Sequence, residues 1–240
     1  MSYEIRVWAE PEPGETYAGG GDPAMGLQHG DDSVWEFIHC GSGEQVCEVQ
    51  GKIDPLTFAD LGAAIGTWYN GALLGIENNQ DGGANRALFN LGYQNIYYEH
   101  TNQGRPYDKA TPRLGINMNA RRRSELISHS RRLLEDGSLV IRSSRLVGQM
   151  ESFALNGVKY EAISGAHDDL VMAYLIAGAM TVYHLEVARM SSHPLLPMVD
   201  GKEVDGPSEE KETLPRKLAR HVMSHTPNRE VWASSAENLI

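Results

Sequence analysis

The sequence predicts an α/β protein in which a mixed β-sheet is covered by helices on both faces. Between residues 16 and 50, short apolar runs separated by turn signals predict antiparallel strands joined as hairpins. After residue 54, short apolar runs alternate with helical patterns, which favours strands joined through helices. The composition agrees, because 41% hydrophobic and 22% charged residues in 240 are typical of a globular protein with a substantial core.

The first half of the chain contains the sequence signals for four β-strands and one helix. Gly41, Ser42 and Gly43 separate two apolar runs, which predicts a hairpin. Asp54 is an expected helix N-cap, and Pro55 suits the first helical turn. The expected elements are strands at 16–22, 33–40 and 44–50, a helix beginning at 54 and a buried strand at 72–76.

The second half of the chain alternates between helical patterns and short apolar runs. Asp136 and Gly137 mark the end of one helix, and Asn156-Gly157 is a turn signal between apolar flanks. The expected elements are helices at 81–91, 121–135, 143–153 and about 168–190, strands at 95–99 and 138–141, a loop or extended hairpin at 101–119, and a hairpin around 156–157.

The two ends of the chain differ in composition from the middle. Residues 1–15 carry four glutamates and two prolines, which predicts an exposed, linker-like lead-in. Residues 191–240 are polar and contain five of the eleven prolines, so we expect a partly disordered tail. The expected domain therefore spans residues 16–190. No apolar run approaches about 20 residues, and no signal peptide is evident, so we expect no membrane association.

Charge and motif content exclude several classes of function. The net charge of −11 argues, at face value, against a broadly basic nucleic-acid binder. The sequence has no phosphate-binding loop of the ATPase type. The two cysteines are too few for a disulfide framework or a four-ligand zinc site, and they suit a reducing compartment.

Four acidic residues lie where apolar segments begin or end. Asp22 follows a run of three glycines that would let a bulky ligand approach, Glu77 closes an apolar run, and Asp168 and Asp169 open the most apolar helix. Each could instead be a helix cap or part of a turn. Together at one sheet edge they would repel one another unless they bound Mg²⁺ or Mn²⁺. Two such ions can promote phosphodiester hydrolysis.

Four segments resemble motifs of the C-terminal nuclease domain of the tailed-bacteriophage terminase large subunit. They are Tyr17 to Gly26 with Asp32-Ser33, Ile53-Asp54-Pro55 with Trp68 to Asn79, Leu91 to Tyr98, and Gly165 to Ala173. The resemblance covers about residues 16–185, in the right order. It implies an RNase H-like mixed β-sheet flanked by helices. It also implies a divalent-metal endonuclease that cuts concatemeric viral DNA during genome packaging.

The resemblance assigns roles to particular residues. Asp22 matches the first metal carboxylate and Glu77 the second, while Asp168 or Asp169 matches the third, around two Mg²⁺ or Mn²⁺ ions. Asp32 matches a further acidic position that would act through a water or another ligand. His167 would orient the acidic pair or approach the phosphate, although it could equally be an ordinary residue in the turn before a helix.

The arginine-rich segment at residues 119–146 is the main candidate for contact with DNA phosphates. The alternative is a solvated helix face with internal salt bridges. No base-reading motif is present, so we expect weak sequence preference. The candidates are Arg105, Lys109, Arg113, Arg121, Arg122, Arg123, Arg131 and Arg132.

The resemblance also implies partners and a place of action. These are double-stranded DNA, the terminase ATPase motor that this sequence lacks, the small terminase subunit and the portal, in the cytoplasm of the infected bacterial host. Two alternatives stay open. One is a resolvase- or integrase-like nuclease of the same fold, and the other is a non-catalytic packaging module stabilised by metal.

Overall fold

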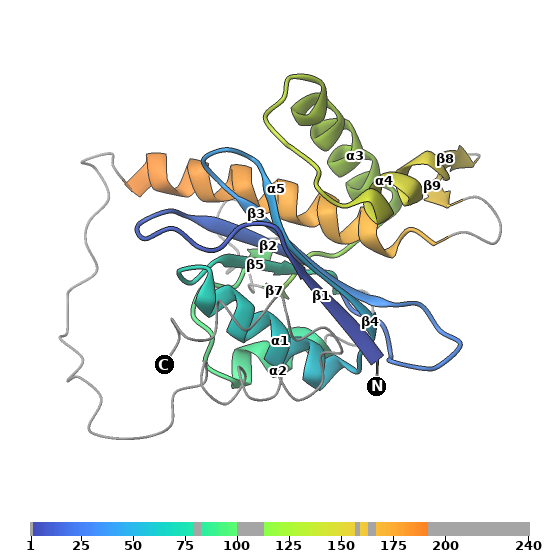
Figure 1. Ribbon diagram of the computed structural model, residues 1–240, viewed down its shortest axis with the longest axis horizontal. Helices are drawn as coiled ribbons and strands as arrows, with labels where there is room; N and C mark the ends of the chain where they lie inside the picture. The colour runs from blue at the N-terminus through green and yellow to red at the C-terminus, as the bar shows by residue number, and fades with distance from the viewer. Residues whose placement is uncertain (1, 79–82, 100–112, 157–158, 163–166, 192–240) are drawn as a thin grey trace, which may run out of the picture.

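The computed structural model describes residues 2–78, 83–99, 113–156, 159–162 and 167–191, and its centre is a five-stranded mixed sheet (Figure 1). The strand order is β1-β4-β3-β2-β5, in which β5 is parallel to β2 and the other pairs are antiparallel. The strands are β1 (Ser2–Val7), β2 (Tyr17–Asp22), β3 (Ser33–His39), β4 (Gln45–Lys52) and β5 (Leu73–Ile76).

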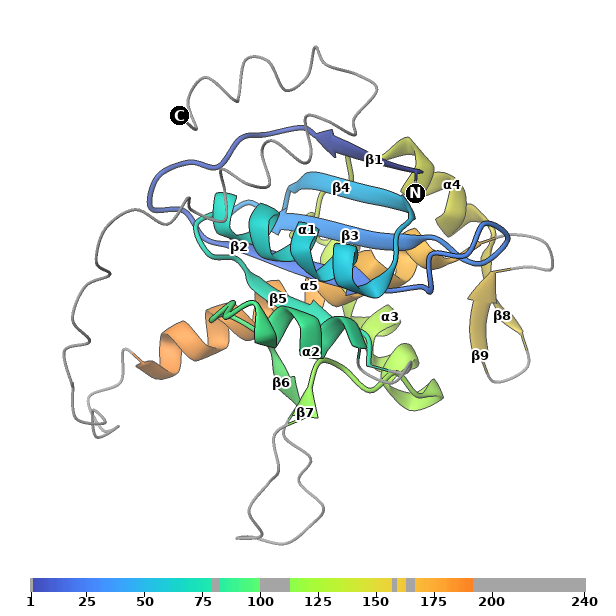
Figure 2. The same ribbon diagram turned by 90° about the horizontal axis from the view of Figure 1, so that it is seen from below.

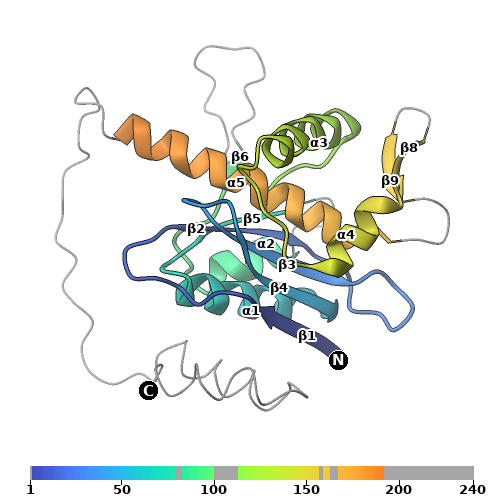
Figure 3. The same cartoon turned by 45° about the horizontal axis from the view of Figure 1, so that its top comes forward.

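Helices cover both faces of this sheet, so the expected α/β architecture of a mixed sheet flanked by helices is confirmed (Figures 1 and 2). One face carries α1 (Pro55–Trp68) and α2 (Gly83–Asn90), and the other carries α5 (Asp169–Ser191). Against α5 pack α3 (Ala120–Glu135), on its outer side, and α4 (Ser144–Glu151), which also contacts β4 through Arg145 and Glu48 (Figure 3). No helix in the described ranges is long and apolar enough to span a bilayer.

Alternation along the central strands divides the core into two layers. In β3, Trp35 and Phe37 pack with Phe58 of α1, whereas Val34 and Ile38 pack with α5. Since α5 is apolar around nearly its whole circumference from Leu170 to Met180, this stretch is buried on two sides, by the sheet and by α3 and α4.

The glycines of β2 serve helix packing and not the approach of a ligand, which corrects the sequence-based interpretation. A Cβ on Gly20 would lie 2.2 Å from the Ala173 oxygen and 2.2 Å from the Ala177 nitrogen of α5. On the opposite face, a Cβ on Gly21 would lie 2.9 Å from rings of Phe58 and Trp35. The backbone of α5 therefore rests directly on the backbone of β2.

The expected boundaries of most elements are close to those observed. Asp54 caps α1 as predicted, because its side chain accepts hydrogen bonds from Leu56 N and Thr57 N. The remaining strands form two small hairpins, one of which is the hairpin predicted around residues 156–157. They are β6 (Tyr98–Glu99) with β7 (Arg113–Leu114), and β8 (Phe153–Asn156) with β9 (Lys159–Ala162).

Two sequence-based expectations are wrong. Ser2–Val7, expected in an exposed lead-in, forms edge strand β1, because Tyr3 and Ile5 alternate with outward residues and become buried against the sheet. The strand expected at 138–141 is absent from the described structure, where Val140 makes an isolated bridge to Glu44. The predicted tail lies outside the described residues apart from Ser191, and the domain limits stay predictions.

A buried carboxyl pair lies inside the sheet, away from its edge. Glu36 of β3 and Glu48 of β4 are direct cross-strand partners, and both are fully buried. Gln45 Nε2 donates to Glu36 Oε2 at 2.6 Å, and Arg145 of α4 donates to Glu48 Oε1. Burial, and next the charge of Glu48, raises the pKa of Glu36 well above its ordinary value. Glu36 is therefore favoured to hold a proton in the folded protein.

A Glu36→Gln variant is expected to unfold at a higher temperature than the wild type at pH 8. The folded wild type keeps a proton that the unfolded chain releases above about pH 4.5. The free energy of unfolding of the wild type therefore falls as pH rises from about 4.5 towards the raised pKa of folded Glu36. The decrease is about 1.4 kcal/mol per pH unit for one proton. The amide needs no proton, so the variant lacks this loss.

Thermal unfolding between pH 5 and pH 9 measures the difference. Glu12→Gln is the control, because Glu12 is exposed and its neutralisation should leave the wild-type pH dependence unchanged. An unchanged pH slope in Glu36→Gln would show that Glu36 is already ionised in the folded state.

Candidate metal centre

Two of the predicted ligands lie at the carboxyl ends of neighbouring parallel strands. Asp22 is the last residue of β2, and Glu77 directly follows β5. Gly21 lies opposite Ile76, and Glu77 N donates to Gly21 O at 2.9 Å. The two carboxylates therefore leave the sheet side by side, at the edge where parallel strands of α/β proteins commonly place ligands.

The other two predicted ligands lie at the start of α5. Asp168 Oδ2 accepts a hydrogen bond from Arg123 Nη1 of α3 at 2.9 Å. Asp169 Oδ2 accepts one from the Asp32 backbone N at 3.2 Å. Gln149 of α4 supports the same helix end, because its Oε1 accepts from Leu170 N at 2.9 Å. Since α5 rests on β2, its first residues lie over the end of that strand.

The electrostatics show that these carboxylates act on one another. Burial raises the pKa of Asp22 well above its ordinary value, and the charges of Glu77, Asp169 and Asp168 raise it further. Burial also raises the pKa of Glu77, against the opposing charge of Arg123. For Asp169, burial raises the pKa to about 6. A cluster of repelling, desolvated acids is the arrangement that a bound cation would relieve.

Asp31 is a candidate ligand that the sequence-based interpretation did not include. One ligand atom from each of Asp31, His167 and Asp169 lies within 4.8 Å of the others. His167 Nδ1 lies 3.9 Å from Asp31 Oδ1 and 3.8 Å from Asp169 Oδ2. His167, predicted to support the acidic pair, is therefore placed beside Asp169. The sequence signal for this ligand is the adjacent pair Asp31 and Asp32, of which the family resemblance favours Asp32.

Asp32 contributes to the centre through its backbone. Its carboxylate is held by Lys52 Nζ at 2.6 Å and by Gln50 Nε2 at 2.9 Å, both on β4. Its backbone N–H meanwhile fixes Asp169. The Asp32 carboxylate is thus paired with side chains of β4 while its amide contacts Asp169, and the action of that carboxylate on the metal through a water stays a prediction.

The predicted DNA-contacting residues fall into different environments. Arg122 donates to Glu99 Oε1 at 2.6 Å and so ties β6 to α3, whereas Arg123 is bound to Asp168. Arg121 and Arg131 pair with Glu125 and Glu135 one helical turn away, as the salt-bridge alternative proposed. Arg105 and Lys109 lie outside the described residues, and Arg113 belongs to β7.

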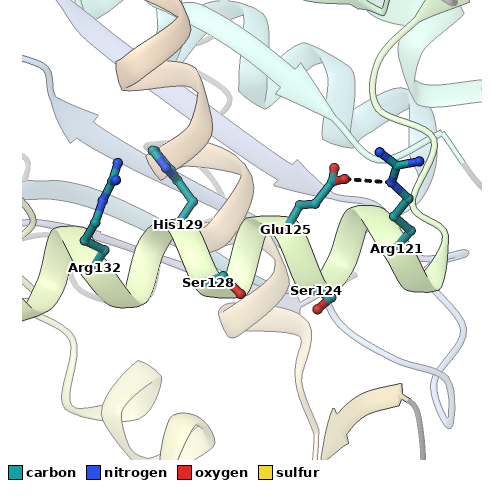
Figure 4. Close-up of a pocket in the computed structure, with 6 residues that line it drawn as sticks. All are labelled: Arg121, Ser124, Glu125, Ser128, His129 and Arg132. Carbon is teal, nitrogen blue, oxygen red and sulfur yellow. Dashed lines mark hydrogen bonds and ion pairs between the residues drawn. The ribbon is translucent and has the colours of Figure 1, made fainter.

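A shallow hollow of about 570 Å³ lies along the outer face of α3 (Figure 4). The view shows these side chains spaced along one stretch of the helix, with basic groups towards both ends. The hollow is lined by Arg121, Ser124, Glu125, Ser128, His129 and Arg132. The basic and hydroxyl side chains of the hollow can donate hydrogen bonds to anionic groups such as phosphates. Glu125 reduces the positive charge of the hollow.

The structure is similar to solved structures of phage proteins. With the large terminase nuclease from thermophilic phage G20c it shares a TM-score of 0.58 at 17% identity, over 75% of this chain and 91% of that chain. With the same nuclease bearing bound magnesium, the TM-score is 0.57 at 18% identity, over 75% and 90%. With the Thermus phage P74-26 large terminase nuclease domain, it is 0.55 at 18% identity, over 74% and 87%.

Sequence comparisons give no further likeness, since no family model and no curated protein match the chain. The motif resemblance recognised from residues 16–185 is thus confirmed at the level of the fold. This chain has the fold of the nuclease domains of phage large terminases.

Proposed function

We propose that this protein is a divalent-metal-dependent endonuclease that cuts concatemeric viral DNA during genome packaging. The observation that carries the proposal is the convergence of Asp22, Glu77, Asp168 and Asp169 at one edge of a sheet that has the terminase nuclease fold. The G20c nuclease, which shares that fold, was solved with bound magnesium.

The side chains at this edge fit Mg²⁺ or Mn²⁺. Carboxylate oxygens are the donors that these ions prefer, and an imidazole nitrogen is acceptable to Mn²⁺ and favoured by Zn²⁺ or Co²⁺. Asp31, His167 and Asp169 would form one group of ligands, and Glu77 and Asp168 another, with Asp22 acting on both. Two bound ions would supply electrostatic activation of a water and of the scissile phosphate.

The surrounding residues hold these donors in place and provide limited contact with DNA. The Asp32 amide fixes Asp169, and Arg123 donates a hydrogen bond to Asp168. On α3, Arg121, His129 and Arg132 are available to contact phosphates from the hollow. Because these contacts are few, we expect weak intrinsic DNA affinity, with firm engagement dependent on the ATPase motor, the small subunit and the portal in the host cytoplasm.

Plasmid cleavage tests the proposal directly. Supercoiled DNA incubated with the folded protein and Mn²⁺ should be nicked and linearised, and EDTA should stop the reaction. Absence of cleavage at millimolar Mn²⁺ would contradict the nuclease proposal. Preference for a four-way junction over linear DNA would instead support a resolvase-like nuclease.

Millimolar Mn²⁺ is expected to raise the unfolding temperature of the wild-type protein, because it binds the folded site. An ion present at 100 times its dissociation constant stabilises the fold by about 2.7 kcal/mol. Asp31→Asn should reduce the shift, and His167→Gln should reduce it more for Co²⁺ or Zn²⁺ than for Mg²⁺.

Differential scanning fluorimetry with each metal measures these shifts. Glu135→Gln is the matched surface control, because Glu135 lies at the far end of α3 and pairs with Arg131. An equal shift in Asp31→Asn and the wild type would exclude Asp31 as a ligand.

A further inference from the structure

Arg123 occupies a different environment from the other arginines of α3. Its side chain is 14% exposed, and that of its partner Asp168 is 25% exposed. By contrast, Arg121 and Arg131 are 88% and 77% exposed, in pairs that contribute little in water. The Arg123–Asp168 pair is therefore a partly desolvated contact, in which removing one charge leaves the other inadequately compensated.

The positive charge of Arg123 reaches more than one carboxylate. Burial is the largest effect on the pKa of both Asp22 and Glu77 and raises both values. The positive charge of the Arg123 guanidinium opposes this increase at each carboxyl group. The guanidinium thus hydrogen-bonds Asp168, and its charge reaches two further acids of the cluster. A single cationic side chain from α3 thus sits where a cation would bind.

The acidic cluster consequently has two halves with different surroundings. The arginine-paired half comprises Glu77 and Asp168, next to Arg123. The open half comprises Asp31, His167 and Asp169, whose ligand atoms already lie within 4.8 Å of one another. Asp22 acts on both halves.

We propose that Arg123 is an internal counter-cation of the arginine-paired half and competes there with a divalent metal ion. The open half then binds metal first, and metal binds between Glu77 and Asp168 only as Arg123 gives up Asp168. This inference rests on the proposed metal-dependent function, which it deepens by making metal loading unequal and dependent on a residue of α3.

Mn²⁺ binding by the full chain tests the inference without reference to activity. Electron paramagnetic resonance of free Mn²⁺ gives the number and affinity of sites in wild type, Arg123→Gln and Arg123→Lys. In Arg123→Gln the weaker site should tighten by about 10-fold, a change of about 1.4 kcal/mol in binding free energy, because no side-chain cation competes with the ion. The stronger site should stay unchanged. Arg123→Lys, which keeps the charge, should resemble the wild type.

Stability in EDTA provides a second readout. Arg123→Gln should unfold at a lower temperature than the wild type, because its carboxylates repel one another without compensation. Adding Asp168→Asn to this variant should restore part of the loss. Circular dichroism of each variant confirms that it is folded before metal is added.

The outcomes separate this inference from the function on which it rests. Mn²⁺ binding by the wild type with no tightening in Arg123→Gln would overturn the competition and leave the metal site standing. Weaker binding in Arg123→Gln would show that Arg123 positions Asp168 for the ion. Absence of Mn²⁺ binding in both proteins at millimolar metal would overturn the competition and the proposed metal centre together.

Discussion

An Asp22→Asn variant is expected to cleave DNA at least about 100-fold more slowly than the wild type in the presence of metal. In EDTA the same variant is expected to unfold at a higher temperature than the wild type. The loss follows because the charges of Glu77, Asp168 and Asp169 all reach Asp22, so Asp22 lies between both halves of the cluster. An amide at this position keeps the shape of the side chain and removes its charge. Metal affinity therefore falls, and cleavage falls with it.

The gain in stability follows from the same burial and repulsion. The folded-state pKa of Asp22 is raised above its ordinary value of 3.8, so the folded protein is destabilised as pH rises past that value and the carboxylate must ionise. Asparagine has no such requirement. The increase in unfolding temperature should be present at pH 8 and should shrink as pH falls towards 4.

Initial rates of plasmid cleavage and thermal unfolding in EDTA measure the two effects in one variant. Asp136→Asn is the control, because Asp136 is an exposed residue at the C-terminal end of α3. It should cleave DNA as the wild type does. Wild-type cleavage by Asp22→Asn would remove Asp22 from the site, and loss of stability in EDTA would contradict the repulsion.

A Gly20→Ala variant is expected to lose about 3 kcal/mol of unfolding free energy, at the upper end of the range for overpacked cores. The added Cβ would lie 2.2 Å from main-chain atoms of Ala173 and Ala177, and a helix backbone cannot rotate away as a side chain can. The helix must shift from the sheet, which moves Asp169 away from Asp22. Metal binding should therefore weaken along with stability.

Urea-induced unfolding measures the change, and Gly148→Ala is the matched control. Gly148 lies inside α4. Apart from its chain neighbours and the adjacent backbone of its own helix, no heavy atom lies within 4 Å of an added Cβ. Alanine there should increase stability by about 0.5 to 1 kcal/mol. A loss below 1 kcal/mol in Gly20→Ala would show that α5 adjusts without strain.

The sequence predicted the elements whose signals are local. Asp54 caps a helix through its own side chain, and the hairpin of β3 and β4 joins neighbouring segments, so both are visible without tertiary information. Strand β1 is missed because it pairs with β4, 40 to 50 residues away along the chain. The glutamates and prolines of residues 1–15 are a local signal for a linker, which the long-range pairing of residues 2–7 overrides.

The sequence predicts that the four carboxylates lie together. It does not predict which neighbouring side chains contact them, because those contacts depend on the tertiary structure. Carboxylates at strand ends and at a helix start are visible in the sequence, and the structure brings these four to one edge. Which of Asp31 and Asp32 faces the centre depends on where Lys52 and Gln50 lie. Likewise, nothing local distinguishes Arg123 from Arg121, since their different roles depend on the position of α5.

The direct contact between the backbones of β2 and α5 has a consequence for the evolution of such a centre. Main-chain atoms on both sides determine how far the end of β2 lies from the start of α5. The surrounding apolar side chains can therefore drift in identity while the spacing between Asp22 and Asp169 is inherited unchanged. Such a constraint would allow a fold to be shared at 17% identity.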